Sequence, residues 1–386
     1  MLTLNPAQSR HLDLIRGVAA QLVLLQHTFG YFPPHPALAD FRWGASGVLA
    51  FFLLSGFLIT GTIHARVAAG RFSLTEFTIG RFGRIFTPYV PAILLVAVLD
   101  HISSRSPKYG YAAEYTFGTA VANLFMLQDF PLFQILRRLG VPEQPWFFKS
   151  FGSGGPFWTV SIEWWIYVTA GLGTYVVLRG VSRGRTPSAW LWALLLAVAF
   201  EPLYHFVGGP GNSLTGAWLC GAAAYAAYRR WIGFRQAHPD HWFGSLLVPA
   251  WAGAVLLAVA RLVFDRLRIY DPVFAVLLAA VLFLPLAFYA GAPRARPSLV
   301  ARLRLDALAF QSYSLYLTHA PILMLLYCFW EERIQGWPGV LLVVVGCNLF
   351  AILFAHLFET PHKHVRAVLL EWVGRLRHRR RHKLAS

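Results

Sequence analysis

Long apolar runs recur from one end of the chain to the other, and they restrict the fold more than any other feature of the sequence. Of the 386 residues, 57% are hydrophobic and 13% are charged, whereas a soluble domain carries about 25% charged residues. A helix needs roughly 20 apolar residues to cross the hydrocarbon core, where the backbone finds no water to bond. The runs do not alternate with period two, so we expect helices and an all-α polytopic membrane protein.

Ten segments are predicted to span the membrane: 11–30, 44–64, 85–103, 157–178, 188–206, 213–229, 246–264, 272–290, 306–329 and 338–358. The segment 117–128 is also apolar but too short to cross comfortably. If it does not cross, a cytoplasmic N-terminus places the later arginine clusters in the cytoplasm, as the positive-inside rule favours. Both termini are then cytoplasmic, and 104–156 is one long external or re-entrant segment. We expect one transmembrane domain over 1–370 and a basic cytoplasmic tail over 371–386.

The chain is strongly basic, with 34 Lys and Arg against 17 Asp and Glu and a net charge of +17. In a soluble protein this excess would suggest a nucleic-acid partner. Here the basic residues lie between apolar spans, so we interpret them as cytoplasmic flanks and expect no nucleic-acid partner. The stretch from Arg375 to Lys383 is expected to contact anionic lipid headgroups of the bilayer.

The first span carries two polar residues that a lipid-facing helix would not need. His27 follows Arg16 by eleven residues, which is three turns and about 16 Å along one helix face. A titratable residue inside a span is costly and indicates a functional site by default. The alternative is that Arg16 extends to the headgroups while His27 bonds a neighbouring helix.

A pair of arginines, Arg81 and Arg84, begins the third span. Three residues apart, they share a helix face at the cytoplasmic end, and guanidinium groups are preferred partners of phosphate. Ordinary inside-positive flanking explains the pair equally well.

Further polar candidates open the fourth span and the ninth. Glu163 and Tyr167 lie one turn apart with Ser161 nearby, so they could orient a substrate hydroxyl or a histidine; alternatively, Glu163 caps a helix N-terminus. His319 is a second imidazole within an apolar run. No metal site is expected, because His238 and His241 lack further ligands at zinc-type spacing.

The motifs, taken in order, resemble those of the membrane-bound acyltransferase-3 family of bacterial O-acyltransferases. The matching stretches cover most of the chain and are 12–17 with His27, 51–59, 81–88, 161–167 and 312–319. One departure is that Leu49 and Ala50 stand where family members commonly carry an acid. Small residues at Ser55 and Gly56 are expected to let helices approach closely.

The resemblance implies ten membrane helices and transfer of an acyl group, often acetyl, from coenzyme A to a hydroxyl of a sugar or glycoside in the bacterial inner membrane. It identifies His27 as the motif histidine with Arg16 as its partner, Arg81 and Arg84 as the paired arginines, and Glu163 as the acid. On these positions we expect His27 to act as the base and the three arginines to bind the phosphates of the donor. Ser161, Tyr167 and His319 are expected to contact substrate or a developing oxyanion.

A second class of protein fits the same spans. In a transporter or flippase, intramembrane His, Arg and Glu could form a polar path. Such proteins often contain inverted repeats and paired broken helices, and the sequence shows neither. The sequence does not identify the acceptor, the length of the acyl chain or the oligomeric state.

Overall fold

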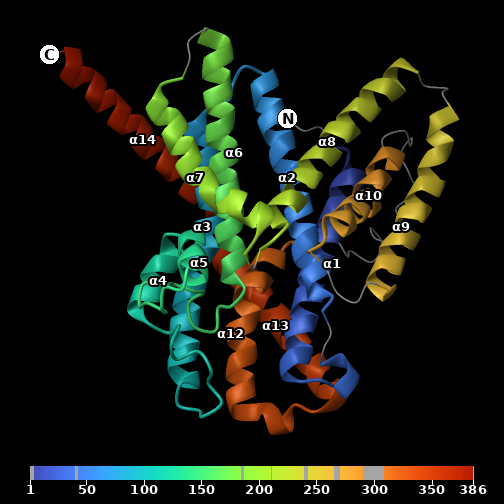
Figure 1. Ribbon diagram of the computed structural model, residues 1–386, viewed down its shortest axis with the longest axis vertical. Helices are drawn as coiled ribbons and strands as arrows, with labels where there is room; N and C mark the ends of the chain where they lie inside the picture. The colour runs from blue at the N-terminus through green and yellow to red at the C-terminus, as the bar shows by residue number, and fades with distance from the viewer. Residues whose placement is uncertain are drawn as a thin grey trace.

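The structure is a computed structural model that describes residues 4–39, 42–183, 187–209, 211–238, 242–264, 270–289 and 308–385. These residues form helices and connecting loops, and none of them lies in a strand (Figure 1). The long helices are α1 Pro6–Tyr31, α2 Gly44–Ala68, α3 Leu74–Ser103, α6 Phe157–Arg183, α7 Ala189–Val207, α8 Leu214–Ala237, α9 Leu247–Phe264, α10 Pro272–Tyr289, α12 Ser312–Trp330, α13 Gly336–Phe354 and α14 His362–Ala385.

Each predicted span coincides with one helix of the series α1 to α13, so the all-helical architecture is confirmed. Five stretches within the described residues are long and apolar enough to cross a bilayer by length and composition: Gly44–Ala68, Leu74–Ser103, Ala189–Val207, Gly244–Leu262 and Gly336–Leu376. The apolar helices indicate a membrane protein, whereas ten crossings and cytoplasmic termini stay predictions. The arginines between positions 290 and 307 lie outside the described residues.

Glycines let α2 and α8 pack with their backbones in contact. A Cβ added to Gly56 of α2 would lie 1.9 Å from the carbonyl oxygen of Trp218 in α8. One added to Gly221 of α8 would lie 2.0 Å from the carbonyl oxygen of Leu53. The prediction that small residues allow close helix contact here is therefore confirmed.

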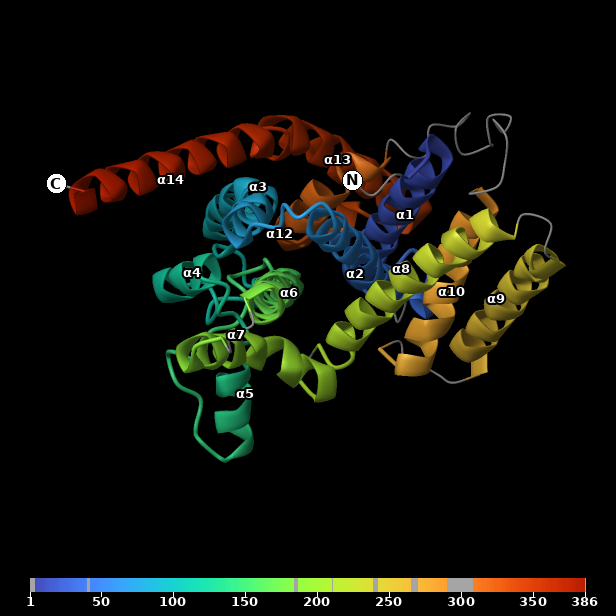
Figure 2. The ribbon, with the colours of Figure 1, turned by 90° about the horizontal axis from the view of Figure 1, so that it is seen from above.

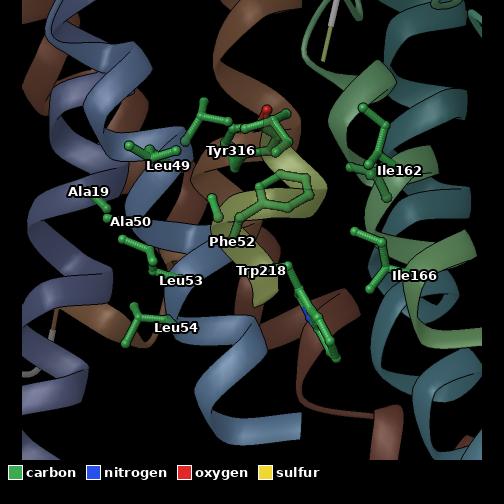
Figure 3. Close-up of a cluster of buried hydrophobic side chains, with 14 of the residues drawn as sticks. Ala19, Leu49, Ala50, Phe52, Leu53, Leu54, Ile162, Ile166, Trp218 and Tyr316 are labelled. Carbon is green, nitrogen blue, oxygen red and sulfur yellow. The ribbon is translucent and has the colours of Figure 1, made fainter. Parts of the chain in front are cut away.

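The bundle core is apolar where α1, α2, α6 and α8 meet. Figure 3 shows Leu49 and Ala50 of α2 together with Ala19 of α1 and with Ile162 and Ile166 of α6. Leu49 is fully buried, so packed hydrocarbon fills the position at which the resemblance noted from the sequence would place an acid.

Residues 104–156 form a compact excursion that is tied back to the bundle. Its helices α4, Phe117–Leu124, and α5, Pro131–Arg138, have eight residues each, and eight residues span about 12 Å. Each is therefore shorter than the roughly 20 residues that a membrane-spanning helix needs, and the placement of 117–128 outside the membrane stays a prediction. The buried carboxylate of Asp100 accepts hydrogen bonds from the Ser153 hydroxyl at 2.5 Å and the Tyr109 hydroxyl at 2.9 Å.

The C-terminal segment is a helix. A π-helical turn, Ala355–Glu359, ends α13, and α14 follows from His362. In Figure 2, α3 and α6 are seen nearly end-on whereas α14 is seen lengthwise, running across α3 and away from the bundle. The basic segment predicted over 371–386 therefore continues a helix inclined to the others.

We predict that Gly56→Ala destabilises the protein by about 1–3 kcal/mol, the typical cost of overpacking a well-packed interface. The matched control is Gly346→Ala in α13, where a Cβ meets nothing within 4 Å and helix propensity favours alanine. Thermal unfolding in detergent is the measurement. Equal melting temperatures for the two variants would show that the α2–α8 contact tolerates a methyl group.

Asp129, in the loop before α5, gives a second prediction. Burial raises its pKa to about 6, although Arg137 and Lys149 oppose the shift. The folded state therefore holds a proton that the unfolded state has lost between about pH 4 and pH 6, and its stability falls as pH rises through that window. We expect Asp129→Asn to stabilise the protein at pH 7.5 by on the order of 1 kcal/mol. The difference from wild type should shrink towards pH 4 in thermal melts; a gain of the same size at both pH values would contradict the shift.

Candidate active site

A cavity of about 170 Å³ lies between α1, α2, α3, α6 and α12. Its polar lining includes five of the residues predicted from the sequence: Arg16, Arg81, Arg84, Glu163 and Tyr167. Apolar side chains of α2 form much of the remaining wall, with Phe51 and Phe52 among them. The helix segments that carry these residues are distant in sequence, so the fold concentrates three cations and one acid in a single apolar enclosure.

Two of the three arginines are paired with carboxylates. Arg16 lies 3.2 Å from Asp13, one turn earlier in α1. Arg84 lies 2.9 Å from Glu359, whose side chain is 5% exposed. The second carboxylate oxygen of Glu359 accepts a 2.8 Å hydrogen bond from the Ser314 hydroxyl in α12. The charges of Arg16 and Arg84 are therefore largely balanced by these two carboxylates.

Arg81 differs from the other two arginines. Among the described residues it forms no ion pair, and its buried Nε has no hydrogen-bond partner. Its guanidinium carbon lies 5.9 Å from the centre of the Tyr167 ring, within cation–π range. An unpaired cation facing a cavity is suited to bind an anionic group.

The acid of the cavity is held by hydroxyl groups. The Tyr167 hydroxyl donates a hydrogen bond to Glu163 and lies 2.9 Å from the Ser55 hydroxyl. Ser55 in turn accepts a 3.2 Å bond from the indole N–H of Trp218. Glu163 lies in the second turn of α6, so it does not cap the helix and its carboxylate is directed to the cavity.

A pair of histidines lies beside the cavity. Nδ1 of His27 lies 3.3 Å from Nε2 of His319 and 2.9 Å from the Val23 carbonyl oxygen. Nδ1 of His319 lies 2.8 Å from the carbonyl oxygen of Leu315. A carbonyl oxygen can only accept, so in the neutral pair both Nδ1 atoms carry the proton, and Nε2 of His319 accepts from His27. This tautomer leaves the Nε2 lone pair of His27 unused by these contacts.

Tyr316 connects the histidine pair to the cavity. Its side chain lines the cavity, and its ring centre lies 6.1 Å from that of His319. The hydroxyl lies 2.5 Å from the Thr159 hydroxyl and 3.2 Å from the Pro156 carbonyl oxygen. Arg16 and His27 belong to one helix, so the arginine end and the histidine end of the site share a rigid wall.

Ser161 lies elsewhere. Its buried hydroxyl donates a 2.8 Å bond to the Met126 carbonyl oxygen, which also accepts from the Trp165 indole at 2.9 Å. Ser161 therefore attaches the 104–156 excursion to α6 and does not line the cavity. Glu359 was not predicted as a site residue, because it follows a long apolar span; the one signal in the sequence was an acid directly before Thr360 and Pro361.

No group of three or more His, Cys, Asp or Glu side chains capable of holding a metal occurs among the described residues. His238 is described, but its predicted neighbour His241 is not. The cavity's donors are guanidinium and hydroxyl groups, which suit an anionic organic ligand better than a metal ion.

Comparison with known proteins now adds to this geometry. A family model described as an acyltransferase domain, that of the acyltransferase-3 family, matches residues 10–356. The chain belongs to the acyltransferase-3 family. No curated protein and no solved structure matches it. The matched region contains every cavity-lining residue and both histidines but ends before Glu359 and α14.

The Arg84–Glu359 pair yields a prediction on stability. Glu359→Gln leaves a guanidinium without its counter-charge; because the Arg84 side chain is 36% exposed, we expect a loss of about 1–2 kcal/mol, below the 3–5 kcal/mol of a fully buried pair. Arg84→Gln and the double variant complete a double-mutant cycle. Thermal melts should give a coupling energy of about 1 kcal/mol, and strict additivity would mean that the pair contributes no interaction energy.

Proposed function

We propose that this membrane acyltransferase moves an acyl group, acetyl in the simplest case, from acyl-CoA to a hydroxyl of a sugar, envelope polysaccharide or glycosylated small molecule. The observation that carries the proposal is the meeting of Arg16, Arg81, Arg84 and Glu163 in one cavity beside the His27–His319 pair. An anion-binding end and a basic end, separated along one helix, match a donor that has phosphates at one end and a thioester at the other.

In this proposal the donor phosphates bind at the arginines. Arg81 supplies an uncompensated charge, while Arg16 and Arg84 contribute N–H donors that their carboxylates do not use fully. The pantetheine arm then extends along α1 towards His27, which lies about 16 Å further along the helix. The apolar wall from α2 excludes water from the thioester.

His27 acts as the general base. Its Nε2 takes the proton of the acceptor hydroxyl as the oxygen attacks the thioester carbonyl carbon. The resulting imidazolium is stabilised because Nδ1–H donates to His319 and to the Val23 carbonyl. The carbon–sulfur bond then breaks, and the thiolate of CoA recovers the proton from His27. Glu163 and Tyr167 orient the reacting groups from the cavity side.

The acceptor enters from the side of the 104–156 excursion, which packs against α3 and α6 next to the site. This direction rests on the predicted topology, with the donor in the cytoplasm of a bacterium and the acceptor at the outer face of its inner membrane. A transporter or flippase is the less favoured function, because the family match is to an acyltransferase.

The proposal predicts a large loss of transfer in His27→Ala, about 10²–10⁴-fold, the usual contribution of a positioned base. Cells making wild type or His27→Ala are fed labelled acetate, and label is followed into base-labile esters of envelope glycans and secreted glycosides. The rate of acyl transfer is then measured with purified protein in proteoliposomes. Labelled acetyl-CoA is the donor, and the acceptor is the glycan fraction that took up label in the cells.

The matched control is His101→Ala, which removes an exposed histidine from the end of α3. It should retain ester labelling. Equal ester labelling in cells making wild type and in cells making folded, inserted His27→Ala would show that His27 is not the base. Solute uptake by proteoliposomes without acyl-CoA, and no ester formation, would favour the transporter.

A further inference from the structure

The helix α14 carries an exposed apolar stripe, and its sequence contains a dense run of basic residues. Val368, Trp372 and Leu376 follow one another at four-residue spacing and are 49%, 59% and 41% exposed. Residues that are four apart share a helix face. Between Arg375 and Lys383 the sequence contains six Lys or Arg residues. Helices with this pairing of aromatic or aliphatic and cationic side chains lie in the headgroup region of anionic bilayers.

The position of α14 brings this surface to a bilayer. The helix continues from α13, whose apolar stretch is one of the candidate membrane spans. Figures 1 and 2 show α14 leaving the bundle at a slant, with its far end beyond α3. A helix that leaves a membrane span obliquely keeps one side near the headgroups, and anionic headgroups are the complementary partner for its charge.

The base of α14 is packed directly on the helix segment that carries the cavity arginines. A Cβ on Gly83 would lie 3.2 Å from the His362 carbonyl oxygen and 3.5 Å from Cβ of Arg366. Gly80 faces Nε of Arg366 in the same way, at 3.7 Å. Gly80 and Gly83 flank Arg81 and precede Arg84, so α14 rests on the backbone that positions both arginines.

A second connection runs through the π-helical turn. Glu359 ends this turn and forms the ion pair with Arg84, while its carbonyl oxygen lies 2.8 Å from Nδ1 of His362, the first residue of α14. π-Helical turns are rare and occur frequently at functional sites. A change in the direction of α14 would therefore move Glu359 and the Gly83 contact together.

We propose that α14 binds the anionic headgroups of the bilayer in which the protein lies, and that this contact holds Arg81 and Arg84 in the cavity, so that donor use depends on anionic lipid. The proposal rests on the proposed function for its catalytic consequence but not for the lipid contact. The family match ends at residue 356, before α14 begins.

The test uses the full chain in nanodiscs of phosphatidylcholine alone or mixed with phosphatidylglycerol. An environment-sensitive fluorophore on Leu376→Cys reports the lipid contact, in a chain with Cys220→Ala because Cys220 is the partly exposed native cysteine. Hydrogen–deuterium exchange of residues 80–88 reports the arginine segment without reference to activity. Transfer from labelled acetyl-CoA is the third readout.

Anionic lipid should shift the fluorophore to an apolar environment, slow exchange over residues 80–88 and increase transfer. Arg379→Glu with Arg380→Glu should remove all three responses, since each cation near the surface contributes about five-fold to binding. The matched control, Arg229→Glu with Arg230→Glu, reverses the charge of two exposed arginines of α8. This variant should retain all three responses to anionic lipid. Glu359→Gln should retain the fluorophore shift while transfer loses its lipid dependence.

An unchanged fluorophore signal in the two bilayers would overturn the lipid contact. A shifted signal with unchanged exchange over residues 80–88 would overturn the connection to the arginines. The fluorophore shift and the slower exchange over residues 80–88 could occur without acyl transfer in any bilayer. That result would support the effect of lipid on the arginine segment and would contradict the proposed function.

Discussion

Three guanidinium groups lie inside an apolar bundle, and accommodating them is the constraint on which the rest of the site depends. An isolated buried cation is costly, and a structure tolerates it when partners are supplied in place. Asp13 supplies one from the same helix, and Glu359 supplies another from the far end of the chain. The third, Arg81, is left with an aromatic ring and an unpartnered Nε. The fold thus pairs two cations with carboxylates and leaves the third facing the cavity. This arrangement requires α1, α3, α6, α12 and the π-helical turn to meet at one point.

The sequence predicted much of this arrangement. The length of the apolar runs located the long helices from α1 to α13, because apolar runs have a direct physical meaning in lipid, but it did not predict that the basic tail forms the helix α14. The polar residues Arg16, Arg81, Arg84, Glu163 and Tyr167 were predicted as one site and do line one cavity. These residues are conspicuous in the sequence because burying a polar group in an apolar span costs free energy, so such residues usually have a function.

Other features depend on tertiary contacts that no local pattern reveals. Ser161 resembles a site residue in sequence, yet its position on α6 directs it to Met126, while Thr159 and Glu163 point to the cavity. His319 was expected to meet substrate, and the structure pairs it with His27 across two helices. Glu359 could not be assigned, since its importance comes from a π-helical turn that rotates it towards Arg84, 275 positions earlier in the chain.

The helix α1 restricts which sequence changes the site can tolerate. Arg16 and His27 lie on one unbroken helix, so their separation is a property of backbone geometry and is insensitive to most side-chain changes. Inserting one residue between them would turn His27 by about 100° and move it away from His319. Substitutions along the lipid-facing side of α1 leave both ends in place. The composition of this helix is therefore free to drift with the surrounding lipid, whereas its length between the two residues is not.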